Sequence, residues 1–460
     1  MGPNQPDPAA LHELTKALPA GTVSTDPTVC ENYRWDWARD PGAGTPVAVV
    51  RPTSADQVQT AVRWAATHGV PVVPRGAGSG LSGGSSALDG GIVLSLERMR
   101  AIEIDTATRV AVVEPGAFNA EVKTAAAASG LWYPPDPSSF EICSIGGNVA
   151  TNAGGLCCVK YGVTTDYVLG LDVVLADGTL VRLGGKRIKD VAGLSLVKLF
   201  VGSEGTLGVV TRAILRLIPA QAPRSTLVAT FGTVEEAAAT VVTVGQTLRA
   251  SMMELLDRVS INAVEDLRPM GLDRAAGALL IAQSDAPGEA RSAEMIVIEA
   301  ACKTHGATEV FVTDDPDEGE LFVAARRAAF PAMEARGSLL LEDVGVPVPL
   351  LPDLLNGIEA LASRHQVEVG VVAHAGDGNT HPIIVFDPND AAAKERSMQA
   401  FGEIMALAIS LGGTITGEHG VGRSKKAALP DQVGPDVMAL QRAIKSALDP
   451  ANIMNPGAVL

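Results

Sequence analysis

Two histidines bracket a short turn in the second half of the chain. His374 and His381 enclose Ala-Gly-Asp-Gly-Asn-Thr, a segment with strong turn signals. If strands flank this turn, both imidazoles lie at one edge of a sheet, close enough to share a metal ion. About forty residues further on, Glu418 and His419 stand between two glycines and add a carboxylate and an imidazole. Two histidines with one carboxylate form an open ligand set, which leaves positions for a substrate or a water molecule.

The alternative for any single histidine is an ordinary place in the core or on the surface. Here three of the seven histidines fall in these two glycine-flanked segments, which favours a metal site. We therefore predict His374, His381 and Glu418 as ligands. Asp377 is a weaker candidate, because Asp-Gly is also a turn signal.

A glycine-rich loop, Pro74–Gly84, follows an apolar strand in the first half of the chain. Within it, Gly78, Gly80 and Gly83 match G-x-G-x-x-G. A dinucleotide fingerprint requires a helix directly after the loop, and the sequence leads into another strand instead. Backbone N–H groups of the loop, with Ser79 and Ser82, could still bind a phosphate as a nest. The alternative is an ordinary glycine-rich turn.

Two further runs, Ser144–Gly155 and Gly202–Gly208, are rich in glycine and small polar residues. We predict the first of them, within the longer stretch Pro134–Gly162, to be poor in helix. Three such runs in one domain fit a long ligand laid against the backbone, whereas three unrelated loops are the alternative.

The predicted helices and strands that position these residues follow different patterns in the two halves of the chain. A strand at Val47–Val50, a capped helix beginning after Ser54 and a strand at Val70–Val73 predict a β-α-β opening. Beyond about residue 220, strands and helices alternate through His374. We predict an α+β protein with a boundary near 220 and a permanent interface between the halves that forms a ligand cleft.

Composition excludes several classes of protein. The 460 residues include 36 Lys and Arg against 52 Asp and Glu, a net charge of −16, so nucleic acid and anionic membranes are poor partners. Five cysteines without a CxxC pair argue against a disulfide framework, a zinc ribbon and an iron–sulfur cluster. The first six residues lack the features of a signal peptide, and no apolar segment predicts a transmembrane anchor. We expect a cytoplasmic protein, with peripheral attachment to the inner face of the membrane as the alternative.

Together these segments resemble the flavoprotein superfamily of vanillyl-alcohol oxidase and p-cresol methylhydroxylase. Within it, the chain is similar to the FAD-linked D-2-hydroxyacid dehydrogenases, which include the flavin subunit of glycolate oxidase, D-lactate dehydrogenases and D-2-hydroxyglutarate dehydrogenase. The matching runs cover most of the chain beyond about residue 40: Pro74–Gly84, Gly146–Gly162, Lys189-Asp190, Gly202–Gly208, His374–His381, Gly417–Gly422 and Asn455-Pro456-Gly457.

The resemblance implies an N-terminal helical segment (1–41), a two-subdomain FAD-binding domain of the p-cresol methylhydroxylase type (42–220), and an α+β substrate and metal-binding domain with a largely antiparallel sheet (221–460). It implies FAD, bound noncovalently because the first glycine loop has no His or Cys. The implied cofactor-binding residues are Pro74, Arg75, Gly76, Ala77, Gly78, Ser79, Gly80, Ser82, Pro135, Ser139, Gly146, Gly147, Asn148, Asn152, Gly154, Glu204, Gly208 and Asn455.

The resemblance also implies the catalytic roles. A divalent ion, Zn²⁺ with Mn²⁺ or Fe²⁺ as alternatives, sits on the three ligands named above. His419 is the implied base, Arg326 the implied grip on the substrate α-carboxylate, and Asn379 lines the same pocket. The chemistry is coherent, since a cation acidifies the hydroxyl, an imidazole accepts the proton and a guanidinium binds the carboxylate as a fork.

Phe330 and Leu341 occupy the places where the hydroxyglutarate enzymes offer a threonine and a lysine to a second carboxylate. Apolar groups cannot offset the desolvation of that carboxylate. We therefore predict oxidation of a monocarboxylate such as D-lactate or glycolate. The alternatives are D-2-hydroxyglutarate, another alcohol on the same FAD fold, and a metal-dependent hydrolase. The electron acceptor lies outside the chain (quinone, cytochrome, a partner iron–sulfur protein or oxygen), and a homodimer is compatible with the sequence.

Overall fold

The structure is a computed structural model that describes residues 6–460, so most of the segment tested for a signal peptide lies outside the described residues. The chain divides into two compact units. The first unit contains the residues up to Gly154, then Val163–Ala220 and Glu418–Leu460, and the second contains Gly155–Gly162 and Gln221–Gly417. The C-terminal stretch belongs to the first unit because its backbone pairs there: Val72 N–H donates to Ile453 O and Asn455 N–H to Val72 O, each at 2.8 Å. The predicted domains, 42–220 and 221–460, did not anticipate this return.

The first sheet of the first unit contains the predicted β-α-β opening. Its strands, in sheet order, are β1 (Val23–Ser24), β2 (Ala48–Val50), β4 (Ile92–Ser95) and β3 (Val72–Arg75). Strand β4 pairs in parallel with both β2 and β3, so it lies between the two predicted strands. The connecting helix α3 (Ala55–His68) begins after Ser54 as predicted and buries an apolar stripe of Val58, Ala61, Val62 and Ala65. Helices α1 (Pro8–Ala17) and α2 (Pro27–Asn32) precede β2.

The second sheet of the first unit is antiparallel. Its strands, in order, are β5 (Ile102–Asp105), β6 (Val110–Val113), β10 (Val209–Arg216), β8 (Val168–Val174) and β9 (Leu180–Gly184). Strands β8 and β9 form a hairpin that turns at Asp177-Gly178, with Gly178 at φ 78°. The other elements of this unit are α4 (Asn119–Ala127), the pair β7 (Leu131–Trp132) and β11 (Ile218–Pro219), α5 (Ile145–Thr151), η1 (Thr164–Asp166), α7 (Leu196–Phe200) and α14 (Leu429–Leu448).

The prediction of little helix in Pro134–Gly162 was wrong. Helix α5 forms there, and α6 (Cys158–Tyr161) follows in the second unit. Ser144 caps α5, because its Oγ accepts the N–H of Gly147 at 3.3 Å, and Asn152 ends it in the left-handed region at φ 55°. Ile145 and Val149 are buried in the core of the first unit, and this packing offsets the poor helix propensity of the two glycines.

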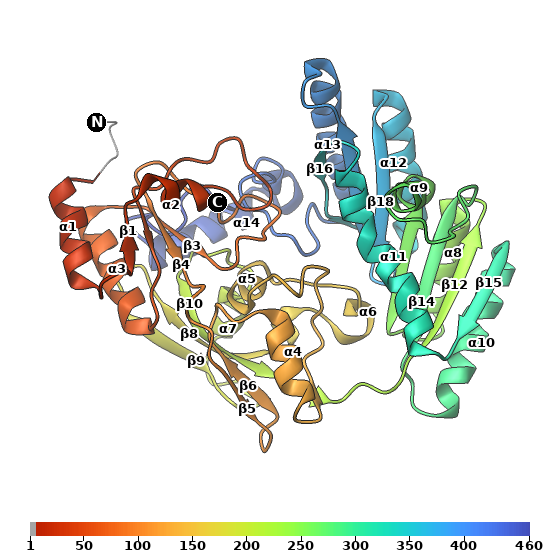
Figure 1. Ribbon diagram of the computed structural model, residues 1–460, viewed down its shortest axis with the longest axis horizontal. Coiled ribbons are helices and arrows are strands. Elements are labelled where there is room, and N and C mark those ends of the chain that lie inside the picture. Colours follow the sequence, from red (N-terminus) through yellow and green to blue (C-terminus); the bar gives the residue numbers. More distant parts are fainter. Residues whose placement is uncertain (1–5) are drawn as a thin grey trace. The chain divides into compact units, whose positions relative to one another are not determined.

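The second unit is built on an eight-stranded antiparallel sheet, of which β12, β14, β15, β16 and β18 are labelled in Figure 1. Its main path is β15 (Glu309–Thr313), β12 (Ser225–Phe231), β14 (Ala278–Ser284), β13 (Met252–Asp257), β18 (Glu368–His374), β19 (Asn379–Phe386) and β16 (Ser338–Leu341), with β17 (Val344–Gly345) also paired to β19. These strands confirm the predicted alternation with helices and the antiparallel sheet.

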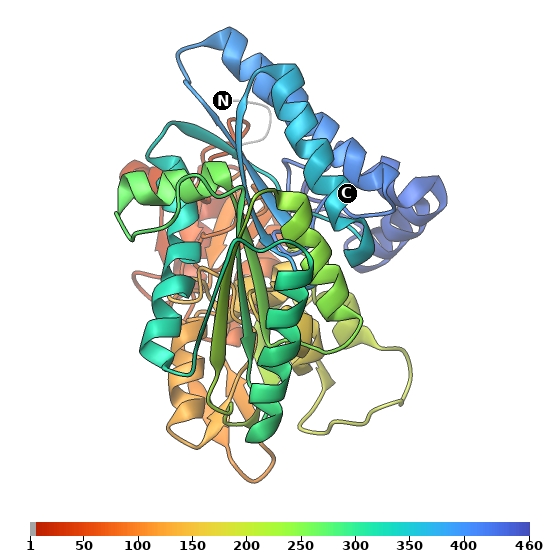
Figure 2. The same ribbon diagram turned by 90° about the vertical axis from the view of Figure 1, so that its right-hand side faces the viewer.

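Helices cover both faces of this sheet, and Figure 2 shows it nearly edge-on. On one face lie α9 (Arg258–Leu267) and α11 (Pro316–Glu334), which pack on each other and on β18. On the other face lie α8 (Val234–Gly245) and α10 (Glu289–Thr304), with α12 (Leu351–His365) and α13 (Ala391–Ser410) continuing this layer after η2 (Val348–Leu350). The core under α9 and α11 includes Leu256, Ala329, Val372 and Ile383. None of the helices within residues 6–460 combines the length and hydropathy needed to cross a bilayer.

Candidate active site

The β18–β19 hairpin brings the two bracketing histidines together. In its register Val372 lies opposite His381, and His374 is two residues beyond Val372. Residues two apart on a strand, and residues directly opposite across strands, share a face of the sheet. The two imidazoles therefore project on the same face, edge to face, with ring centroids 5.0 Å apart. Both side chains are buried.

A carboxylate that the sequence did not single out joins His374 to Arg326. Glu254 lies on β13, and the register that pairs Leu255 with Ala373 puts it opposite His374 when continued by one residue. Its Oε1 lies 2.8 Å from His374 Nδ1, and its Oε2 accepts a hydrogen bond from Arg326 Nε at 2.7 Å. The three residues are 1%, 3% and 4% exposed, in the order Glu254, His374 and Arg326. The sequence signal that could have identified Glu254 is that it is the one acidic residue within the apolar run Met252–Leu256.

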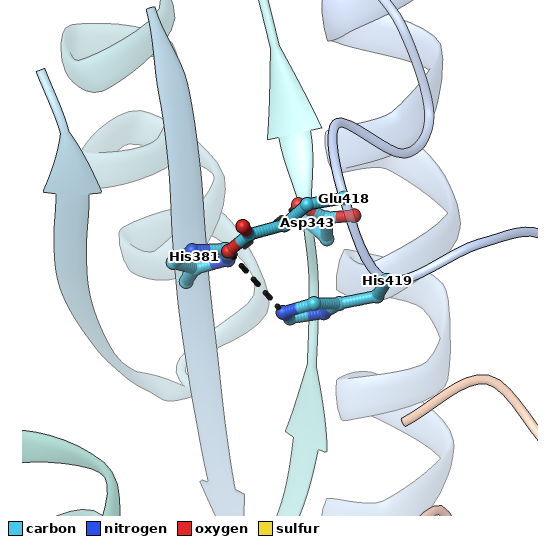
Figure 3. A group of neighbouring side chains, drawn as sticks. All are labelled: Asp343, His381, Glu418 and His419. Carbon is cyan, nitrogen blue, oxygen red and sulfur yellow. Dashed lines mark ion pairs between the residues drawn. The ribbon is translucent and has the colours of Figure 1, made fainter. Parts of the chain in front are cut away.

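A second group of possible ligands contains His381, Glu418 and His419, together with Asp343 (Figure 3). One ligand atom from each residue lies within 4.8 Å of the others. Glu418 and His419 directly follow Gly417, whose N–H donates to Asp343 O at 3.1 Å. The dashed line in Figure 3 joins His419 Nε2 to Glu418 Oε1, 3.8 Å apart. His374 is not in this group, although its ring contacts that of His381.

Asp343 was missed because its environment is created by distant residues. Its Oδ1 accepts a hydrogen bond from Asn379 Nδ2 at 3.0 Å, and its Oδ2 accepts one from Thr416 Oγ1 at 2.6 Å. The usable signal was the acidic pair Glu342-Asp343 directly after an apolar strand. Two imidazoles and two carboxylates suit Zn²⁺, and equally Mn²⁺ or Fe²⁺.

Asn379, the predicted pocket residue, contacts Asp343 and also lies against the loop at Gly417, directly before Glu418. A β-carbon on Gly417 would stand 2.4 Å from Asn379 Oδ1, so the close approach of this loop depends on glycine at that position. Among residues 6–460, Asn379 Oδ1 has no hydrogen-bond partner. This buried acceptor is compatible with the predicted role beside the substrate.

In the first unit, the first glycine loop offers a cradle of backbone donors. No acceptor within residues 6–460 receives the N–H groups of Gly76, Gly78, Ser79 and Gly80. A β-carbon on Gly78 would lie 2.1 Å from the Arg75 guanidinium, and Gly78 has φ 74°, so this position requires glycine. Ser144 Oγ accepts the N–H of Ala77 at 3.2 Å and thereby ties the loop to α5. These donors fit the pyrophosphate of a dinucleotide cofactor.

Several other predicted cofactor residues have side chains engaged within the first unit. Glu204 accepts the N–H groups of Val421 and Gly422 at 2.7 and 2.9 Å, and burial raises the pKa of its carboxyl to about 7. Asn455 Nδ2 donates to Gly84 O and to Glu204 O, both at 2.8 Å.

The contacts of the remaining residues to a cofactor stay predictions. Pro74 and Arg75 end β3, Ser82 Oγ donates to His419 O, and Gly208 precedes β10. The others lie around α5: Pro135 and Ser139 before the helix, Gly146, Gly147 and Asn148 within it, and Asn152 and Gly154 after it.

The donor cradle fits a dinucleotide cofactor, and comparison with known proteins identifies the class, the flavin-dependent oxidoreductases. Residues 220–459 match the family described as FAD linked oxidases, C-terminal domain, and residues 46–184 match the FAD binding domain. The chain belongs to the FAD-linked oxidase family, binds FAD and is an oxidoreductase.

Within this family, the chain is similar to proteins named for the oxidation of 2-hydroxyacids. The chain is 41% identical to the glycolate oxidase subunit GlcD of Bacillus subtilis over 90% of this chain and 88% of that protein. It is 35% identical to a D-lactate dehydrogenase of Archaeoglobus fulgidus over 91% and 93%. Among solved structures, p-cresol methylhydroxylase superposes with a TM-score of 0.81 at 17% identity, over 98% of this chain and 96% of that chain. The 4-ethylphenol oxidase of Gulosibacter chungangensis does so with 0.80 at 19%, over 99% and 98%. These last two likenesses show the fold alone.

Proposed function

We propose that the chain is an FAD-dependent dehydrogenase that oxidises a D-2-hydroxymonocarboxylate to the 2-oxoacid. The observation that carries the proposal is a buried arginine that Glu254 links to His374, one of two histidines on the same face of the second unit's sheet. Arg326 uses Nε for Glu254, and within residues 6–460 its Nη2 has no hydrogen-bond partner. A buried guanidinium with an unused donor suits a carboxylate ligand. The names of the relatives, glycolate oxidase subunit and D-lactate dehydrogenase, support the same class of substrate.

The residues of the chain divide the work of the reaction. Arg326 binds the α-carboxylate and orients the substrate. His419 takes the hydroxyl proton on a ring nitrogen, with Glu418 beside it. His374, His381, Asp343 and Glu418 are the candidate ligands for a divalent ion, and the loop after β3 holds FAD noncovalently. When bound, FAD supplies the hydride acceptor and the ion supplies Lewis acidity.

The apolar side chains near this face select the substrate. Leu341 pairs with Ile383, which lies two residues from His381 on β19, so Leu341 projects on the same face as the histidines. Phe330 follows Arg326 by four residues on α11, which places both on one side of that helix. Both side chains pack against the core under α11 and offer no donor to a second carboxylate.

Replacing Leu341 with lysine is expected to raise kcat/KM for D-2-hydroxyglutarate by about tenfold or more, because a cation at this point pairs with the distal carboxylate. The test is dye reduction by the FAD-loaded protein with D- and L-lactate, glycolate and D-2-hydroxyglutarate. Leu340→Lys, one residue earlier and on the opposite face, is the matched control. A wild-type preference for the diacid over D-lactate would contradict this account of the pocket.

A further inference from the structure

Glu254 is shared by two residues that have different tasks in the proposed reaction. One carboxylate oxygen meets the imidazole of His374, a candidate metal ligand, and the other meets the guanidinium of Arg326, the proposed carboxylate anchor. We propose that Glu254 is a positioning residue that sets both groups at once and so couples cation binding to substrate binding. This inference rests on the proposed function and adds a residue to it.

The first half of the argument concerns His374. An ionised carboxylate can only accept hydrogen bonds, and Oε2 of Glu254 accepts one from Arg326 Nε at 2.7 Å. His374 therefore carries its proton on Nδ1 and donates it to Oε1 across 2.8 Å. That bond selects the tautomer with a lone pair on Nε2, on the other side of the ring. Carboxylates that orient metal-ligating histidines in this way raise the basicity of the ligand and fix the ring.

The second half concerns Arg326. Its side chain reaches from α11 to the sheet, and the bond from Nε to Glu254 Oε2 fixes the plane of the guanidinium. Nη2 finds no acceptor within the described part of the chain. A planar fork held at one edge presents its other donors in a defined direction, which a carboxylate ligand requires for two parallel bonds.

The setting explains why one carboxylate serves both groups. Glu254, His374 and Arg326 are all at least 96% buried, so a lone charge among them would be costly. Glu254 balances the charge of Arg326, and antiparallel pairing of β13 with β18 holds it opposite His374. A purely structural acid would affect folding alone, whereas this acid should affect the affinity for two chemically different ligands.

The experiment uses the FAD-loaded protein and the isosteric change Glu254→Gln. The amide keeps the volume, but its single oxygen can accept from only one of the two donors. We measure Zn²⁺ affinity by competition with a chromophoric chelator, and oxalate affinity from the perturbed flavin spectrum. We expect Zn²⁺ to bind about 10–100-fold more weakly, and oxalate to bind about tenfold or more weakly.

The matched control is Glu265→Gln. Glu265 is also a buried carboxylate of the second unit, on α9, and accepts the N–H groups of Met270 and Leu272 at 2.8 and 2.9 Å. This variant should leave both affinities unchanged. If Glu254→Gln does not fold, Glu254→Asp keeps the charge on a shorter stem and is expected to weaken both ligands in part.

The outcomes separate this inference from the proposed function. A Glu254 variant whose Zn²⁺ and oxalate affinities both match the wild type overturns the inference, and so does a wild-type protein that binds no Zn²⁺. A wild-type protein that oxidises no 2-hydroxyacid contradicts the proposed function instead, while the two affinities still decide the role of Glu254.

Discussion

Replacing His419 with alanine should lower kcat for D-lactate by about 10²–10⁴-fold, the range that a positioned general base contributes. His419 Nε2 lies 3.8 Å from Glu418 Oε1, and His419 belongs to the group whose candidate ligand atoms lie within 4.8 Å of one another. Alanine removes the proton acceptor but leaves the backbone, whose carbonyl accepts a hydrogen bond from Ser82 Oγ at 3.1 Å. The loop should therefore keep its place, and KM should change less than kcat.

The measurement is steady-state dye reduction with FAD content and thermal stability recorded in parallel. His68→Ala is the control, since His68 is a partly exposed histidine paired with Glu13 on the surface of the first unit. Near-normal turnover in the His419 variant, with full FAD and a wild-type melting temperature, would remove His419 from the role of base.

Replacing Arg326 should have the second largest effect and should act through binding. Loss of a desolvated, hydrogen-bonded charge costs about 2–5 kcal/mol, which corresponds to roughly 30-fold or more in kcat/KM. Arg326→Ala also leaves the buried Glu254 without its cation, so we expect the free energy of unfolding to fall by about 3–5 kcal/mol. Arg326→Lys keeps the charge but not the fork, and should retain stability better than affinity.

Kinetics and thermal unfolding of both variants test this account, with Arg327→Ala as the control. Arg327 is the next residue on α11 and pairs with Glu320 rather than with Glu254. If Arg326→Lys binds D-lactate and oxalate as tightly as the wild type, the substrate carboxylate is held elsewhere.

What could be predicted from the sequence depends on whether the signal is local. Residues close together in the sequence predict the hairpin between His374 and His381 and the capping box of α8, Thr233 with Glu236. Both features are present. Helix α5 was missed because Ile-Gly-Gly-Asn has poor helix propensity, and what stabilises it is the Ser144 cap and burial.

Non-local features needed the structure. Glu254 and His374 are 120 positions apart, and only the register of β13 on β18 reveals that they pair. Asp343 likewise has hydrogen-bond partners, Asn379 and Thr416, that are distant in the sequence. The return of residues 418–460 to the first unit depends on backbone pairing of Met454 with Val72, which leaves no pattern in either segment. The spacing of His374, His381 and Glu418 predicted a metal site, whereas the role of His419 as the base was predicted only from the resemblance to a family.

The most direct test of the account is anaerobic mixing of the FAD-loaded protein with D-lactate, followed by the flavin absorbance in the blue. We expect rapid bleaching by D-lactate, little by L-lactate, and a large loss of rate after treatment with a chelator that Zn²⁺ or Mn²⁺ restores. Bleaching that is equally fast in the metal-free protein would contradict the metal site, and a flavin that no 2-hydroxyacid reduces would contradict the proposed reaction itself.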